Sequence, residues 1–398
     1  MRGKDNPVSL GAKKHEVEVA LDSPLIAALY YGFEPRHSPR ISKDDALEWR
    51  GTKDPLLHPD EAKKLAPFTF DIAERSALLR AYAEENWDKL PPPLTFAFRK
   101  PFGGSEWRKP ADYIMSLEVI GFSGSSAEAI TIRCALSILE DAGFKNLTVA
   151  VNGIGDKDSI ADYERMLGHY IRKNVQHMPA ELRQELRKCV YALPRTSDEK
   201  SEKWKLEAPK SMSFLSDASR QHLKEILEYV ESFDVPYMID PSLIGCPEFS
   251  SHVVFEIRNE SRTLAFGYRY SRLAKRVGLK KELLAVSATI AFPKTSARRA
   301  RNFTKPRFYL VQLGFGAKMH SLRTLETLRK ARIAVVHSLM KDRMQSQIGT
   351  AENSKIPYIL IIGQKEAIEG SVVVRDVNTR VQETVPLENL ASYIKKLK

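Results

Sequence analysis

The chain has 398 residues, of which 43% are hydrophobic and 28% are charged, and this globular composition excludes a wholly disordered protein. Lysine and arginine number 62 against 50 acidic residues, so the net charge of +12 permits a polyanionic partner without requiring one. At this length we expect about two or three domains.

The sequence lacks the patterns typical of membrane proteins and of metal-binding proteins. It contains no run of about 18 apolar residues, so we expect no membrane span, and residues 1–10 are too polar for a secretory signal. The cysteines Cys134, Cys189 and Cys246 are far apart and lack C-x-x-C spacing, and no histidines have the spacing of metal ligands. We therefore expect a cytoplasmic protein without a disulfide framework or a metal site.

In the first 155 residues, helical and strand patterns alternate. The run Pro91-Pro92-Pro93 ends a helical pattern, because proline cannot continue a helix. Ser125 and Glu128 have the spacing of a capping box. Helices are predicted at residues 24–32, 71–86 and 125–139, and strands at 94–98, 113–121 and 147–151.

The middle of the chain combines a charged helical region with several strands. Residues 158–189 are predicted to be one charged helix, and the polar residues 196–210 a loop. A further helix is predicted at 217–233. Strands follow at residues 235–239, 251–258, 263–269 and 285–292, the second and third forming an antiparallel pair.

A basic segment, residues 293–306, is predicted to link two domains. No acidic residue lies between Glu282 and Glu326. That window contains the basic residues Lys294, Arg298, Arg299, Arg301, Lys305, Arg307, Lys318 and Arg323. Such a segment is either a solvated hinge or a surface for a polyanion.

From residue 307 the pattern becomes a regular alternation of strand and helix, which favours a mostly parallel sheet with right-handed crossovers. The predicted strands are residues 308–313, 333–337 and 358–362, with a hairpin of 371–376 and 381–385. The predicted helices are residues 321–332, 344–353 and 387–397.

Several segments, in this order and spacing, resemble histidyl-tRNA synthetase, a class II aminoacyl-tRNA synthetase. They are residues 117–121 (LEVIG), 127–129 (AEA), 147–156 (LTVAVNGIGD), 235–241 (VPYMIDP), 252–257 (HVVFEI), 354–363 (SKIPYILIIG) and 370–376 (GSVVVRD). The resemblance implies an α+β fold: a class II antiparallel sheet core at residues 1–292 with a helical insertion at about 157–216, the basic linker, and a C-terminal α/β anticodon-binding-like domain at 307–398. It also implies a homodimer.

The reactive motifs of that family are mostly missing. Its Leu-Arg-Pro-Glu loop aligns with residues 70–73 (FDIA), its Arg-Gly-Leu-Asp-Tyr-Tyr motif with 245–250 (GCPEFS), and its Gly-Leu-Glu-Arg motif with 291–294 (AFPK). Adenylate formation needs fixed cations and Mg²⁺ to stabilise charge on the phosphates of ATP. We therefore assign no catalytic residue, and expect ATP and Mg²⁺ as cofactors only if the chain is an active ligase.

Two sets of residues remain as candidate sites. A residual nucleotide or substrate pocket, or structural ion pairs in its place, would involve Arg99, Glu118, Arg269 and Tyr270. RNA contact, with phosphates above all, would involve Lys294, Arg298, Arg299, Arg301, Lys305, Lys341, Arg343 and Gln345.

Three functions remain open from the sequence. The first is a synthetase-like protein without aminoacylation activity that binds tRNA or other RNA through the C-terminal domain and the basic linker. The second is an active histidine–tRNA ligase with a divergent pocket. The third is a regulatory subunit that resembles that of ATP phosphoribosyltransferase.

Overall fold

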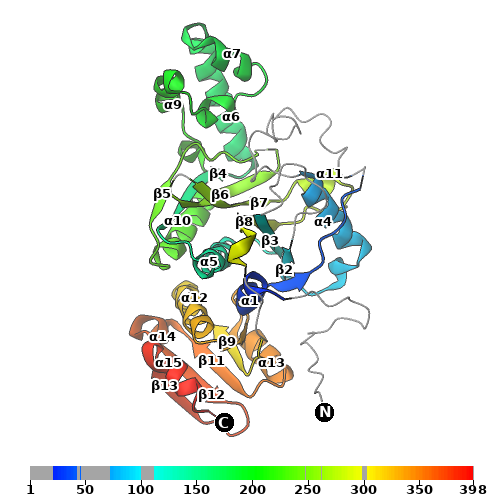
Figure 1. The fold of residues 1–398 in the computed structure, drawn as a ribbon, viewed down its shortest axis with the longest axis vertical. Helices are drawn as coiled ribbons and strands as arrows, with labels where there is room; N and C mark the ends of the chain where they lie inside the picture. Colours follow the sequence, from blue (N-terminus) through cyan, green and yellow to red (C-terminus); the bar gives the residue numbers. More distant parts are fainter. Residues whose placement is uncertain are drawn as a thin grey trace. The chain divides into compact units, whose positions relative to one another are not determined.

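The computed structural model describes residues 21–42, 45, 72–99, 112–246, 248–260, 262–297 and 303–397. The chain divides into two compact units (Figure 1), of which one comprises Arg36–Ala297 and the other joins Met1–Pro35 to Arg298–Lys398. The helix α1 (Ser23–Tyr30) therefore belongs with the C-terminal unit. The domain division predicted from the sequence assigned these residues to the core of residues 1–292.

The core unit is built on an eight-stranded sheet, in which the pairings that lead from β2 to β4 are antiparallel and β5 pairs with β4 in parallel. The predicted antiparallel core is thereby confirmed. In spatial order the strands are β1 (Glu34–Arg36), β2 (Leu94–Arg99), β3 (Asp112–Ile120), β8 (Ala285–Pro293), β7 (Arg262–Tyr270), β6 (Ser250–Asn259), β4 (Leu147–Gly155) and β5 (Tyr237–Ile239).

Helices cover both faces of this sheet (Figure 1). On one face lie α5 (Ser126–Asp141) and α10 (Asp217–Glu231), and Leu223 of α10 packs directly over Gly153 of β4. On the other face lie α4 (Ile72–Glu84) and α11 (Leu273–Arg276), where Leu78 and Leu79 join Phe96 and other strand residues in one apolar cluster. Both layers bury apolar surface, which stabilises the sheet.

The helical insertion has an apolar cluster of its own, which includes Tyr163, Leu167 and Leu193. The prediction of one helix over 158–189 is wrong, because the chain turns before Pro179, whose ring and missing N–H disfavour a continuous helix. The predicted loop at 196–210 is also wrong, since part of it is helical. The helical elements are α6 (Lys157–Asn174), η3 (Val175–His177), α7 (Ala180–Leu186), α8 (Ala192–Arg195), η4 (Glu199–Ser201), α9 (Glu202–Glu207) and η5 (Ser211–Phe214).

The C-terminal unit has a five-stranded mixed sheet. Strands β10 (Val335–His337), β9 (Phe308–Gln312) and β11 (Tyr358–Ile362) are parallel in that spatial order, and β12 (Ser371–Asp376) and β13 (Gln382–Pro386) continue it antiparallel. The sheet is therefore less parallel than predicted. Its helices are α12 (Phe315–Lys330), α13 (Met344–Asn353), α14 (Gln364–Glu369) and α15 (Leu387–Ile394).

Hydrogen bonds of Tyr31, the residue after α1, join this helix to α12 and β10 of the C-terminal unit. The hydroxyl of Tyr31 donates to Glu326 of α12 at 2.5 Å, and the Nε2 atom of His337 lies 3.0 Å from the carbonyl oxygen of Tyr31. Gly32 has a φ of +78°, and a Cβ there would lie 3.0 Å from the ring of His337. Glycine therefore permits this close approach of α1 to the end of β10.

Candidate functional site

Two clusters of buried polar side chains flank β3, β7 and β8, one on each face of the sheet. Successive residues of a strand point to opposite faces, so the neighbours Arg269 and Tyr270 of β7 enter different clusters. Their exposed fractions are 0% and 1%. Both clusters are therefore closed to solvent at β7.

The first, which we call the Glu118 cluster, lies on the α4 face. The carboxylate of Glu118 accepts hydrogen bonds from Arg75 of α4, from the Ser287 hydroxyl at 2.9 Å and from the Tyr270 hydroxyl at 3.2 Å. Glu118 is 0% and Arg75 is 3% exposed. The members of the cluster are Arg75, Glu118, Tyr268, Tyr270, Ser287 and Thr289.

The charges of this cluster are paired inside it. Burial lowers the pKa of the Arg75 guanidinium, but the carboxylate of Glu118, together with Tyr268, Tyr270 and Glu74, outweighs burial and keeps that pKa above its usual value. Burial raises the pKa of Glu118, and Arg75 opposes the rise. Burial also raises the pKa of Tyr268 to about 12, so its hydroxyl is neutral at physiological pH. Arg75 donates to this hydroxyl at 3.4 Å.

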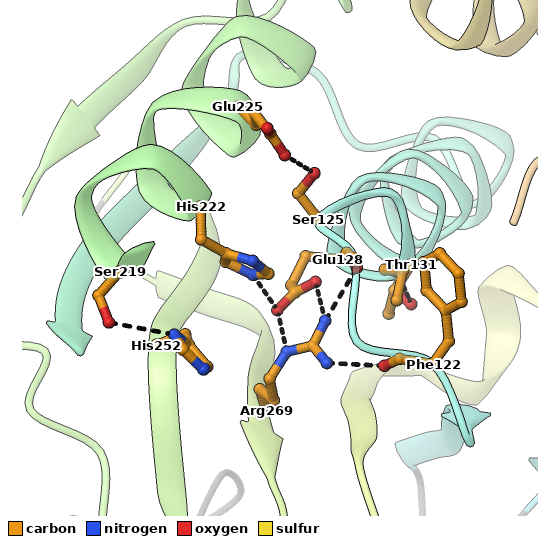
Figure 2. A network of polar contacts seen from close by, with 11 residues as sticks. Phe122, Ser125, Glu128, Thr131, Ser219, His222, Glu225, His252 and Arg269 are labelled. Atoms are coloured by element: carbon orange, nitrogen blue, oxygen red, sulfur yellow. Dashed lines mark hydrogen bonds and ion pairs between the residues drawn. The ribbon is translucent and has the colours of Figure 1, made fainter. Parts of the chain in front are cut away.

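The second, the Arg269 cluster, lies on the α5 face (Figure 2). The Nε atom of Arg269 is 2.7 Å from Oε1 of Glu128, and its Nη2 atom is 2.6 Å from Oε2. The same guanidinium donates to the carbonyl oxygens of Phe122 at 2.7 Å and Gly124 at 3.0 Å. Nε2 of His222 lies 3.0 Å from Oε1 of Glu128. Arg269 thereby ties β7 to the loop that precedes α5.

Glu128 is charged in this environment. Burial would raise its pKa, but Arg269 and His222 outweigh burial and hold the pKa at about 2. The predicted capping box is wrong, because tertiary partners engage both side chains: Glu128 binds Arg269, and the Ser125 hydroxyl donates to Glu225 at 2.5 Å instead of capping α5. The carboxylate still lies in the first turn of α5, where the helix dipole favours negative charge.

A histidine pair borders the Arg269 cluster (Figure 2). The rings of His222 and His252 have centroids 4.9 Å apart, and Nδ1 of His252 lies 3.3 Å from the Ser219 hydroxyl. His252 has a φ of 57° where β6 is irregular in its pairing with both β4 and β7. Burial, with the nearby His222 and Arg269, lowers the pKa of His252 to about 4. Its ring is therefore neutral at pH 7.

The four residues of the predicted pocket are divided between these surroundings. Glu118 and Tyr270 bind each other in the Glu118 cluster, whereas Arg269 lies on the opposite face. Arg99, at the end of β2, places its guanidinium 5.6 Å from the ring centroid of Tyr113. The structure therefore brings two of the four together.

Sequence reasoning missed the arginine that pairs with Glu118. Arg75 lies 43 residues before Glu118, and no local pattern links the two. A signal was available, since Arg75 precedes Leu78 and Leu79 by one helical turn and so lies on the buried face of α4. His222 was missed for the same reason, because its partner Glu128 is 94 residues away.

The described candidates for RNA contact lie at the surface. Lys294 and Lys305 are exposed towards the two ends of the basic segment, and Arg298, Arg299 and Arg301 lie outside the described residues. Lys341 is half-buried in the loop after β10. Arg343 and Gln345 are exposed at the start of α13.

The described residues give little support to a bound metal ion. Among them, no group of three or more His, Cys, Asp or Glu side chains could hold one. The carboxylates of Glu118 and Glu128 each face an arginine, so in this arrangement they do not fit as ligands for Mg²⁺. In the ranges that the structure describes, every helix is too short or too polar to span a membrane.

Comparison with known proteins confirms the resemblance drawn from the sequence motifs. Residues 310–397 match the family model of the anticodon binding domain. The chain is 25% identical over 311 residues to histidine–tRNA ligase 2 of Bacillus anthracis, covering 75% of this chain and 73% of that protein.

Two solved structures whose titles name histidyl-tRNA synthetase are similar to this chain. One is apo histidyl-tRNA synthetase of S. aureus, with a TM-score of 0.49, 18% identity and coverage of 93% of each chain. The other, titled an ATP phosphoribosyltransferase regulatory subunit/histidyl-tRNA synthetase from Bacillus halodurans C, has a TM-score of 0.45 and 14% identity, and the match covers 90% of this chain and 99% of that one. By sequence, the chain resembles histidine–tRNA ligases over three quarters of its length.

Proposed function

We propose that this protein binds tRNA, or another RNA, through its C-terminal domain and the basic segment, and that its core does not form histidyl-adenylate. The observation that carries the proposal is the match of residues 310–397 to an anticodon binding domain. We further propose that the protein is a cytoplasmic homodimer, as the resemblance implies.

The surface chemistry of the C-terminal unit supports RNA binding. Lys341 and Arg343 precede the exposed Gln345 by four and two residues in the chain, and amide side chains can bond base edges while cations contact phosphates. The basic segment adds further cations, which are Lys294, Lys305 and the arginines between them. Contacts of this kind release counterions, so the affinity should fall steeply with salt.

The pairing of the buried charges supports the absence of adenylate formation. An adenylating site needs cations that face the phosphates of ATP. Arg75 and Arg269 instead face Glu118 and Glu128, inside clusters closed to solvent. At the position where the family has its substrate-facing arginine, this chain has Gly245 beside the fully buried Cys246.

Electrophoretic mobility shift of total tRNA with the full-length protein tests the RNA claim. We expect a shift at low salt that weakens steeply as salt rises, and a weaker shift for the Lys341→Ala/Arg343→Ala variant. Lys395→Ala, an exposed lysine after α15, serves as the matched control and should bind like the wild type. Absence of a shift at low salt would refute RNA binding.

An active histidine–tRNA ligase is the second candidate, favoured by the names of the relatives that match three quarters of the chain. In this case the substrate carboxylate and ATP would bind through residues other than Arg75 and Arg269. Histidine-dependent exchange of pyrophosphate into ATP separates the two candidates, since the proposed function predicts none.

A further inference from the structure

Two glutamine side chains are buried together at the carboxyl end of β9 in the C-terminal unit. Gln312, the last residue of β9, is 1% exposed, and Gln347 of α13 is 0% exposed. The backbone N–H of Gln312 donates to Oε1 of Gln347 at 3.1 Å, and Nε2 of Gln347 donates to the carbonyl oxygen of Gln312 at 2.8 Å. The side chain of Gln347 thus pairs with β9 as another strand would.

Both glutamines also bind the loop that follows β10, residues 338–343. Nε2 of Gln312 donates to the carbonyl oxygens of Leu339 at 3.2 Å and Lys341 at 2.9 Å. Nε2 of Gln347 donates to the same Lys341 oxygen at 3.0 Å. The two amides therefore hold the loop by its backbone and leave its charged side chains unengaged by them.

The loop has an inner and an outer side. Leu339 and Met340 are 2% and 7% exposed, whereas Arg343 is exposed. The backbone N–H of Lys341 closes a turn onto the carbonyl oxygen of Ser338 at 2.8 Å. The buried amides thus hold the backbone of the loop on its inner side, and Lys341 and Arg343 lie between these amides and solvent.

Buried amides are costly unless they are hydrogen-bonded. Here three of the amide hydrogen bonds converge on the loop 338–343, while Oε1 of Gln312 is buried without a partner among the described residues. A loop that is ordered before binding loses less conformational entropy when RNA binds. This arrangement therefore favours affinity at the surface that carries Lys341 and Arg343.

We propose that Gln312 and Gln347 are positioning residues, which hold the loop 338–343 so that Lys341 and Arg343 contact the RNA backbone together. The inference rests on the proposed function, and it explains how Lys341 and Arg343 are held in place on the RNA-binding surface. Neither glutamine touches the RNA. Each acts through the backbone of the loop.

Fluorescence anisotropy of labelled total tRNA with the full-length protein, over a salt series, tests the inference. For Gln347→Ala we expect about tenfold weaker binding at low salt, with the slope of log affinity against log salt flatter by about 1.5, as when two phosphate contacts no longer form. Lys341→Ala should add little in the Gln347→Ala background, since that lysine is already misplaced. Gln347→Glu keeps the acceptor for the Gln312 N–H but loses the donors to the carbonyl oxygens of Gln312 and Lys341 and sets a buried carboxylate against them, so it should bind no better than Gln347→Ala.

Leu390→Ala controls for lost stability, because Leu390 is fully buried in α15, a helix that packs on α12, β12 and β13. It should lower the melting temperature and leave the salt slope unchanged. Wild-type affinity and slope in Gln347→Ala, or additive effects of Gln347→Ala and Lys341→Ala, would overturn the inference and leave RNA binding intact. A wild-type protein that binds no tRNA would overturn both.

Discussion

Arg269 and Glu128 form a bidentate ion pair in which neither side chain reaches solvent: Nε lies 2.7 Å from Oε1 and Nη2 lies 2.6 Å from Oε2. The pair joins β7 to α5, and the two carbonyl oxygens that Arg269 also binds belong to the loop between β3 and α5. A guanidinium held in this way stabilises the packing of β7 against α5. We propose that it contributes nothing to binding an anionic substrate.

Removal of one partner should therefore destabilise the core unit strongly. Arg269→Ala leaves the Glu128 carboxylate buried without its main partner, which costs about 3–5 kcal/mol in comparable cases. Urea unfolding followed by circular dichroism measures the loss. The double variant Arg269→Ala/Glu128→Ala should lose less than the sum of the single variants.

The ion pair between Arg165 and Asp162 is a matched control. Its atoms are 2.8 Å apart, but its side chains are 70% and 56% exposed. Arg165→Ala should change the free energy of unfolding by about 0.5 kcal/mol or less. An Arg269→Ala variant as stable as this control would contradict the structural role.

Stability should fall on acidification in two steps. The pKa of His252 is about 4 in the folded protein against a usual 6.5, so the unfolded chain binds more protons between these values and stability is lost as pH falls from 6.5 to 4. The pKa of Glu128 is about 2 against 4.5, so its contribution is lost between pH 4.5 and 2. Thermal melts over this pH range measure both steps.

His252→Asn should remove part of the first step, because asparagine tolerates a positive φ and does not titrate. Burial also lowers the pKa of His337 in the C-terminal unit to about 4, so this histidine still contributes to the loss of stability between pH 6.5 and 4 in the variant. An unchanged pH profile in His252→Asn would show that His252 does not titrate as its burial requires.

How far the sequence predicted the fold depended on the length of each pattern. The bounds of α13 and β11 were predicted as observed, since each has clear periodicity and a marked end. Helix α14 was missed because its six residues are too few for a helical period to show. The resemblance located Glu118, Arg269 and the segment 127–129 that contains Glu128, but Arg75 lies 43 residues before Glu118 and Glu128 lies 141 residues before Arg269, so no local pattern indicates either pair.

Gly267 should be intolerant of substitution. Its cross-strand partner is Phe255, whose Cζ atom would lie 2.1 Å from an added Cβ. Gly267→Ala should cost about 1–3 kcal/mol through overpacking, and Phe255→Leu in the same chain should recover part of the loss. Urea unfolding measures the change, and a Gly267→Ala variant of wild-type stability would contradict this close packing.

Gly349 provides the opposite case. It lies within α13, its φ is not positive, and no atom lies within 4 Å of an added Cβ. Gly349→Ala should therefore stabilise the protein by about 0.4–1 kcal/mol, because alanine restricts the unfolded chain and favours helix. A lower melting temperature in this variant would show that α13 does not adopt its helical form.

The basic segment should contribute affinity without sequence preference. Replacing the exposed Lys294 and Lys305 by alanine should weaken binding by similar factors for all RNAs tested, since phosphate contacts carry no base information. The slope of log affinity against log salt should flatten by about 0.7–0.9 for each phosphate that is no longer neutralised. A weakening confined to one RNA would assign these lysines to base recognition instead.

The most direct measurement of the central claim is histidine-dependent exchange of labelled pyrophosphate into ATP by the purified full-length protein. With Arg75 and Arg269 committed to buried carboxylates, we predict no exchange above the rate without histidine, in a preparation that still shifts tRNA. Exchange that depends on histidine and saturates with its concentration would contradict the proposed function, and would establish the protein as an active ligase.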